Sequence, residues 1–225
     1  MRMLSSWHDI DRPVNQSFQT LLVLPKSFSM TKQVSFLHNQ AGSFGTVFIV
    51  DISGYSRFVM DTALSDGVRI IESLLEALLP DITGLFQISE IEGDAVLYYS
   101  LGIPIPVCEI LAQFRKMLHD FDELISMTTE RFPQVAELTI KLVVHYGPLI
   151  EYSVGGFKKL YGSTVVEAHR LLKNHVDCHT YALITEAYFK EQAVFGISFP
   201  ETGNFMYDVY DVGKVNYVLF KSPFV

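Results

Sequence analysis

Two aspartates stand where predicted strands end, and their chemistry depends on whether the fold brings them together. Asp51 lies near the end of the apolar run TVFIVDIS, and Asp94 follows Gly93 in the stretch SEIEGDAVLYY. Two carboxylates a few ångströms apart repel each other and raise each other's pKa unless a cation lies between them. Hard divalent ions such as Mg²⁺ prefer carboxylate oxygens and leave room for phosphate oxygens. If adjacent, these aspartates would form a one-metal or two-metal nucleotide site.

A turn follows Asp51 and adds a second feature that suits a nucleotide. Ser53, Gly54 and Tyr55 predict a turn into a helix, whose first backbone N–H groups could hold a triphosphate. Spacing alone leaves a simpler interpretation equally open, in which Asp51 caps this helix and Asp94 sits in a hairpin turn. The surrounding elements must decide between the two.

Hydrophobic periodicity predicts the elements that would position these residues. Nearly every position of 46–53 is apolar or β-branched, which is typical of a central strand buried on both faces. Apolar residues recur at helical spacing from Val68 to Leu79, so a helix is predicted over 66–79, ended by Pro80. The other predicted elements are strands at 86–91, 95–99, 137–147 and 148–154, helices at 105–131 and 164–173, and strands at 181–184, 205–210 and 215–220.

This order of strands and helices begins βαββαβ. The predicted fold is therefore α+β, with a ferredoxin-like βαββαβ core and additional C-terminal strands and helix. Thr164 and Glu167 fit a capping box at the start of the added helix. In the ferredoxin-like topology the first strand lies beside the hairpin of the second and third. We therefore expect Asp51 and Asp94 to lie close together at one edge of the sheet.

The composition bounds the class of protein. The 225 residues, 49% of them hydrophobic, suffice for one domain at 44–225 after an N-terminal extension of residues 1–43. The net charge of −8 argues against a protein that neutralises nucleic-acid phosphates or docks on an anionic membrane. No apolar run approaches the roughly 20 residues of a membrane span. Cys108 and Cys178 form no disulfide framework, so a reduced, cytoplasmic setting is predicted.

Four blocks of the chain, in this order, carry a resemblance to a known family: FIVDISGYSRFV, EIEGDAVLYY, VVHYGPL and LYGSTVVEAHRLL. They are similar to blocks of the class III adenylate/guanylate cyclase catalytic domain, in a poorly characterised bacterial branch. Each block is weak alone, but four in order on the matching topology are fairly specific. The resemblance runs from about Phe48 to Leu172 and extends towards Phe220. It implies a head-to-tail homodimer that binds a nucleoside triphosphate with Mg²⁺ or Mn²⁺ and forms a cyclic nucleotide with release of pyrophosphate.

The resemblance also implies roles for single residues. Asp51 and Asp94 match the two metal-binding aspartates, and Ile52 matches the residue that lends a backbone carbonyl to the metal. The turn at Ser53, with Gly54 and Tyr55, matches the loop that wraps the triphosphate.

An arginine of the family stabilises the charge that develops on the phosphate and reaches across the dimer to the partner's metals. Arg170 matches that arginine. Without the resemblance, a lone arginine on a helix is more often solvated or bound in an ion pair.

The chain departs from the family at the base-selecting positions. Glu90 stands where adenylate cyclases carry lysine and guanylate cyclases carry glutamate, and Lys159 stands at the second base-selecting position. Two interpretations stay open for this pair. Each side chain reads one edge of a base, or the two bind each other and close the base pocket.

A second departure affects catalysis. Val166 replaces the asparagine that orients the ribose and the transition state, and losing such a contact typically raises the barrier by about 2.7–4 kcal/mol. The lysine that holds the terminal phosphates has only a loose match in Lys214. These departures favour an alternative function, a non-catalytic nucleotide-sensing or dimerisation module.

Histidines add two weaker signals. His175, Cys178 and His179 have spacings that a metal could use, but an ordinary loop is the favoured interpretation. His145 falls on a predicted strand and is predicted to be a hydrogen-bonded core histidine.

Overall fold

The computed structural model describes residues 43–79, 86–194, 205–210 and 213–219, and of the last two segments the backbone alone. The N-terminal extension, apart from Ser43, and Pro80 lie outside these residues.

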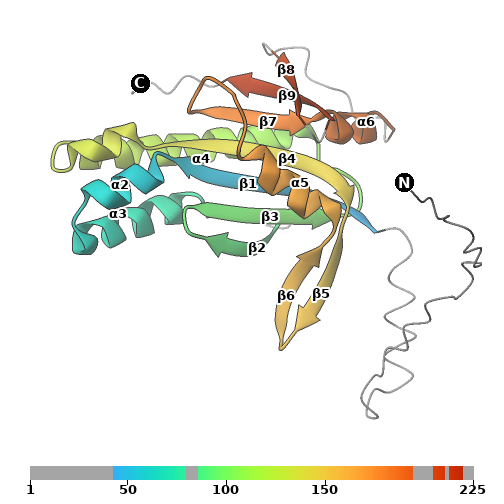
Figure 1. Ribbon diagram of the computed structural model, residues 1–225, viewed down its shortest axis with the longest axis horizontal. Coiled ribbons are helices and arrows are strands. Elements are labelled where there is room, and N and C mark those ends of the chain that lie inside the picture. The colour runs from blue at the N-terminus through green and yellow to red at the C-terminus, as the bar shows by residue number, and fades with distance from the viewer. Residues whose placement is uncertain (1–42, 80–85, 195–204, 211–212, 220–225) are drawn as a thin grey trace, which may run out of the picture. The chain divides into compact units, whose positions relative to one another are not determined.

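The described chain contains both helices and strands (Figure 1). The elements are β1 (Phe44–Ser53), α2 (Tyr55–Asp61), α3 (Leu64–Ala77), β2 (Gln87–Glu92), β3 (Ala95–Leu101), α4 (Val107–Thr129), the 3₁₀ helix η1 (Pro133–Glu137), β4 (Thr139–Pro148), β5 (Ile150–Val154), β6 (Phe157–Tyr161), α5 (Ser163–Leu171), β7 (Tyr181–Thr185), α6 (Glu186–Val194), β8 (Phe205–Tyr210) and β9 (Gly213–Leu219). No described helix is long and apolar enough to cross a membrane.

The strands form one seven-stranded sheet in the order β2-β3-β1-β4-β7-β9-β8, and β5 and β6 form a separate hairpin. β1 is antiparallel to both β3 and β4, whereas β7 joins β4 in parallel. The first four strands, with α3 and α4 as connections, make the βαββαβ unit. The predicted α+β fold is therefore confirmed, and β7 to β9 with α5 and α6 are its C-terminal additions.

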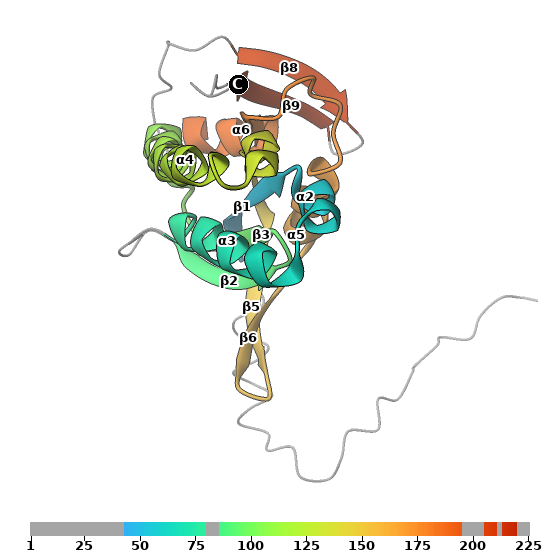
Figure 2. The same cartoon turned by 90° about the vertical axis from the view of Figure 1, so that its left-hand side faces the viewer.

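Each face of the sheet packs against its own helices (Figure 2). Alternate β1 residues Phe48, Val50 and Ile52 face a large core that α3, α4 and α6 cover. The residues between them, Val47 and Ile49, face a smaller core beneath α5. Asp51 continues this second alternation, so it lies on the α5 face of the sheet, away from the two ferredoxin-type helices.

Three elements escaped the sequence prediction: η1, β6 and α6. The helix expected after the turn at Ser53 to Tyr55 is α2. β6 pairs with β5 through a two-residue turn, in which Gly155 and Gly156 have φ values of 57° and 88°. A Gly-Gly pair is a hairpin signal, because glycine adopts positive φ without steric cost. α6 lacks an apolar stripe, and its buried Tyr188 and Gln192 bind the carbonyl of Ile105.

One finer prediction was wrong. The capping box does not form, since α5 begins at Ser163. The Thr164 hydroxyl instead donates to the Pro148 carbonyl (2.8 Å), and Glu167 binds a histidine.

Candidate functional site

The sheet register places Asp51 and Asp94 side by side. Asp51 lies opposite Ala95 of β3, the residue after Asp94. The Ile52 N–H donates to the Asp94 carbonyl at 3.1 Å, which joins the two aspartate segments directly. The pKa of Asp94 is raised, first by burial and then by the charge of Asp51, whereas its own backbone N–H and Lys141 lower it. The structure thus brings together the two carboxylates that the sequence singled out.

A hollow of about 340 Å³ opens beside this pair on the α5 face of the sheet. It is lined by Ile49, Asp51, Glu90, Glu92, Gly93, Asp94, Ala95, Leu97 and His169. Its lining holds four carboxylates, of which Asp51 and Glu90 each form an ion pair with a lysine, Lys141 and Lys159. The other two, Glu92 and Asp94, leave the hollow negatively charged, and negative charge attracts cations.

Lys141 of β4 supplies one positive charge next to the aspartates. Its Nζ lies 2.8 Å from Oδ2 of Asp51, and the two side chains are only 18% and 15% exposed. It approaches from the β4 side of Asp51, whereas the hollow lies towards β2 and β3. Lys141 was not predicted as a site residue. The sequence signal was weak, a polar residue in an otherwise apolar strand.

The two aspartates fit a hard divalent ion that arrives with a nucleotide. Among the residues that the structure describes, no group of three or more His, Cys, Asp and Glu side chains could hold a metal. Mg²⁺, however, usually keeps several waters and takes one or two carboxylates together with substrate phosphates. The neighbouring carboxylates of Asp51 and Asp94 match that donor set, and Ile52 of β1 is hydrogen-bonded to the Asp94 turn.

The turn after Asp51 forms as predicted. Gly54, at φ 87°, precedes the first residue of α2, and its carbonyl accepts from the N–H of Phe58. A Cβ at Gly54 would lie 2.9 Å from the carbonyl oxygen of Glu137, so only glycine fits there. The Ser53 hydroxyl donates to the His179 carbonyl at 3.2 Å, and Tyr55 packs partly buried against the large core. The side chains of this turn thus anchor it, which leaves its backbone as the part available to a ligand.

The helix α5 carries the predicted catalytic arginine on its outer side. Arg170 is exposed, and Val166, one turn earlier, is 57% exposed. Neither lines the hollow of its own chain, where the α5 contribution comes from His169. An exposed Arg170 is the arrangement expected if it serves the site of a partner subunit. His169 was missed because only the fold shows which side of α5 faces the hollow.

Glu90 and Lys159 do meet. The Lys159 Nζ lies 3.0 Å from Oε2 of Glu90, and this hydrogen bond raises the pKa of the lysine. Glu90 is on β2 and Lys159 on β6, so the ion pair ties the β5–β6 hairpin to the edge of the sheet. A second pair on the same hairpin joins Lys158 to Glu151 at 3.2 Å. The pairing of Glu90 with Lys159, one of the two interpretations left open, is thus present in the structure.

His145 is confirmed as a core histidine. It is 3% exposed, its Nδ1 lies 2.9 Å from the Thr185 hydroxyl, and its Nε2 lies 2.5 Å from Glu167. Burial lowers the pKa of His145, against the opposing effect of Glu167. The neutral tautomer with hydrogen on Nε2 satisfies both neighbours, so the residue is structural.

None of the remaining candidates whose side chains are described lines the hollow. The Cys178 thiol donates to the Thr180 carbonyl at 3.3 Å in the loop after α5. Lys214 lies in β9, and its side chain is outside the described part of the chain.

Comparison with protein sequences finds relatives without an assigned function. A family described as "Protein of unknown function (DUF2652)" matches residues 71–181. An uncharacterized protein of Mycobacterium tuberculosis is 29% identical over 140 residues, which are 59% of this chain and 66% of that protein. The chain thus spans just under two thirds of that relative's length.

Solved structures identify the fold. The guanylyl cyclase Cya2 superposes with a TM-score of 0.60 at 13% identity, over 79% of this chain and 92% of that chain. The adenylyl cyclase CyaB from P. aeruginosa gives 0.59 at 13% identity, over 81% and 97%. The guanylate cyclase domain of RhGC from Catenaria anguillulae, solved in complex with GTP, gives 0.50 at 19% identity, over 79% and 96%. The chain therefore has the fold of the adenylyl and guanylyl cyclase domains, the fold that its sequence blocks implied.

Proposed function

We propose that this chain is a class III nucleotidyl cyclase-like domain that binds a nucleoside triphosphate and a divalent metal at a homodimer interface. The observation that carries the proposal is the pairing of Asp51 with Asp94 in one acidic hollow beside α5. Other proteins support the proposal through the fold that this chain shares with cyclase domains, one of which was solved in complex with GTP. The bound triphosphate would be converted to a cyclic nucleotide and pyrophosphate.

The reaction joins the ribose 3′-oxygen to the α-phosphorus and breaks the bond from that phosphorus to the pyrophosphate oxygen. The 3′-hydroxyl proton leaves to solvent, and pyrophosphate carries away the bonding electrons. Asp51 and Asp94 would hold Mg²⁺ or Mn²⁺, and Ile52 would add its carbonyl. The bound metal would supply charge stabilisation and make the 3′-hydroxyl more acidic. The backbone of Ser53, Gly54 and Tyr55 binds the terminal phosphates.

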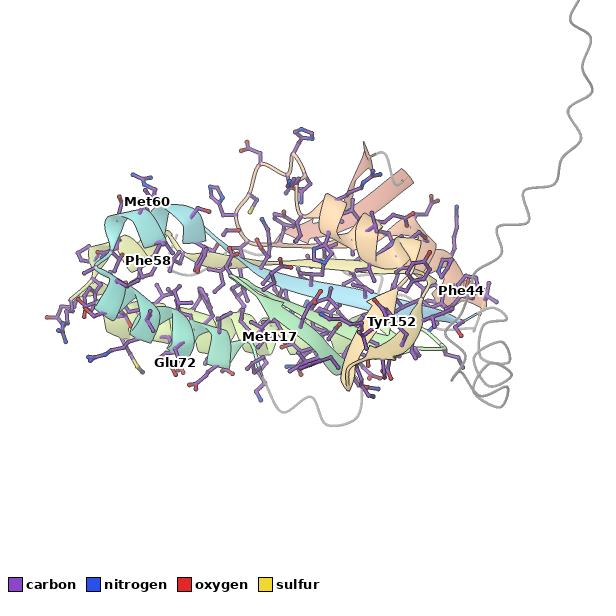
Figure 3. All side chains as sticks on the ribbon, turned by 60° about the horizontal axis from the view of Figure 1, so that its bottom comes forward. Phe44, Phe58, Met60, Glu72, Met117 and Tyr152 are labelled. Atoms are coloured by element: carbon purple, nitrogen blue, oxygen red, sulfur yellow. The ribbon has the colours of Figure 1, made fainter. Side chains whose placement is uncertain are left out.

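A homodimer would complete the site. Arg170 is exposed on α5 and would stabilise the phosphate charge at the partner's metal. The β5–β6 hairpin also exposes one apolar face, with Tyr152, Val154, Phe157 and Tyr161 between 39% and 74% exposed. Figure 3 shows Tyr152 on this hairpin. An apolar stripe of this kind typically marks a protein interface.

A second function is favoured by one observation. Val166 is exposed one turn before Arg170, where the family carries an asparagine, and a valine side chain can neither donate nor accept a hydrogen bond. The paired Glu90 and Lys159 point the same way, because their charges satisfy each other. On this account the chain binds a nucleotide without turning it over, as a sensing or dimerisation module.

Product analysis separates the two functions. Purified protein is incubated with ATP, GTP, CTP and UTP in turn, with Mn²⁺, and cyclic products are measured by mass spectrometry. The cyclase function predicts a cyclic product from at least one substrate that Asp51→Ala abolishes. Nucleotide binding that depends on Asp51, with no product from any substrate, would establish the non-catalytic module. Absence of both binding and product would exclude both functions.

A further inference from the structure

Lys141 and Asp51 form an ion pair at the place where the proposed metal would bind. The 2.8 Å contact is largely shielded from water, at 18% and 15% exposure of the two side chains. Exposed pairs elsewhere in the chain differ in this respect. Lys190 and Glu186, for example, are 71% and 39% exposed at 3.3 Å. Because water screens the Lys141 charge only weakly, that charge acts strongly on its neighbours.

The charge of Lys141 reaches both aspartates. It contacts Asp51 directly, and it opposes the rise in the pKa of Asp94 that burial and Asp51 cause. Two carboxylates alone would present two negative charges to an incoming cation. With Lys141 beside them the group presents one, and Oδ2 of Asp51 is already occupied by the ammonium. A divalent ion entering alone therefore meets a half-neutralised site and a repelling charge.

We propose that Lys141 is the internal counter-ion of the aspartate pair and keeps the site from holding a divalent ion until a nucleotide is present. The triphosphate adds several negative charges and further oxygen ligands, which outweigh the repulsion from one ammonium group. The metal then enters together with the nucleotide, and the empty site does not trap free cations. This inference rests on the proposed metal site at Asp51 and Asp94.

The test measures Mn²⁺ binding without nucleotide, from the electron paramagnetic resonance signal of free Mn²⁺. Lys141→Met removes the charge and should bind Mn²⁺ about tenfold more tightly than the unaltered chain, or better. Lys141→Arg keeps the charge and should bind as weakly as the unaltered chain. Lys190→Met makes the same net-charge change far from the aspartates and is the matched control. Lys141→Gln, which keeps a hydrogen-bond donor for Asp51, repeats the test if the methionine variant does not fold.

Asp51→Ala in the Lys141→Met background shows whether a negative result overturns only the counter-ion role of Lys141 or the metal site as well. If Asp51-dependent Mn²⁺ binding is equal or weaker without Lys141, the counter-ion role is overturned and the metal site stands. If no Mn²⁺ binding depends on Asp51 in any variant, with or without nucleotide, the metal site and the counter-ion role both fail. A gain in affinity that Lys190→Met shares would show a general charge effect and would also overturn the inference.

Discussion

The carboxylate of Asp94 is half-buried beside that of Asp51, and both effects raise its pKa. A residue whose charged form is penalised in the free protein is an unfavourable choice for stability alone. A ligand that favours the charged form, such as a divalent cation, turns the same penalty into binding energy. At the scale of residues, the charged form of Asp94 thus destabilises the free protein, and the proposed cation would remove that destabilisation.

Removing the charge of Asp94 should therefore stabilise the protein. A carboxyl whose folded pKa is raised binds more protons when folded, so its contribution to stability is lost as pH rises through its pKa range. Asp94→Asn has no carboxyl to ionise, so its stability does not fall in this way as pH rises. At neutral pH its free energy of unfolding should exceed that of the unaltered chain by at most about 1 kcal/mol, since the group is only half-buried. Urea unfolding at acidic and neutral pH measures the difference.

The same variant should lose Mn²⁺-dependent nucleotide binding. Asp61→Asn, an exposed aspartate of α2 paired with Arg57, is the control and should change neither property. A lower stability of Asp94→Asn at neutral pH would contradict the account of strain at the aspartate pair.

At the scale of elements, the turn between β1 and α2 is built for close backbone approach. Gly54 has a φ of 87°, and its Cα lies so near η1 that a Cβ would meet the Glu137 carbonyl at 2.9 Å. Gly93 in the β2–β3 turn has a φ of 60° but has nothing within 4 Å of a built Cβ. The cost of a positive φ and the cost of a steric clash can therefore be measured separately, the first at Gly93 and both together at Gly54.

Alanine at the two glycines should give different losses. Gly93→Ala bears only the cost of positive φ, about 1 kcal/mol, whereas Gly54→Ala adds a backbone clash, for a total of about 3 kcal/mol. Thermal and urea unfolding give both values. Equal losses would mean that the β1–α2 turn can shift away from η1, which would weaken its assignment as a fixed phosphate-binding turn.

At the scale of the whole molecule, the proposed site is incomplete in one chain. Arg170 does not line the hollow, and the described residues show exposed apolar side chains in several places, of which two are compared as dimer interfaces. One is the β5–β6 hairpin, where Phe157 and Tyr161 are 73% and 74% exposed. The other is α2, where Met60 is 84% exposed while Phe58 points inward (Figure 3). Of these two places, only the hairpin carries Lys159, the predicted base-selecting residue.

A homodimer built through the hairpin should depend on Phe157. Phe157→Ser removes a large apolar contact, so the dimer dissociation constant should rise about tenfold or more, because hot-spot aromatics carry much of an interface's energy. Sedimentation velocity over a range of protein concentrations measures the constant. Met60→Ser is the matched control, equally exposed but on α2, and should leave the constant unchanged. If Met60→Ser weakens the dimer instead, the interface lies on α2.

Much of the site followed from local sequence. The apolar run of β1 predicted a central strand, and the order of elements predicted that Asp51 and Asp94 would meet. The Gly155-Gly156 pair is a hairpin signal, but the β5–β6 hairpin was not predicted from it. By contrast, α6 carries no apolar periodicity, and its buried polar side chains find their partner 83 and 87 positions earlier in the chain.

Sequence alone thus determined the order of helices and strands in the βαββαβ core, the aspartate pair and the resemblance to cyclases, because hydrophobic period and short motifs are local properties. Only the tertiary structure decided the neighbours of those residues. It placed Lys141 on Asp51, joined Lys159 to Glu90, and turned His169 rather than Arg170 towards the hollow. Such contacts join strands and helices that are distant in sequence, and they depend on register and helix rotation, which no local pattern encodes.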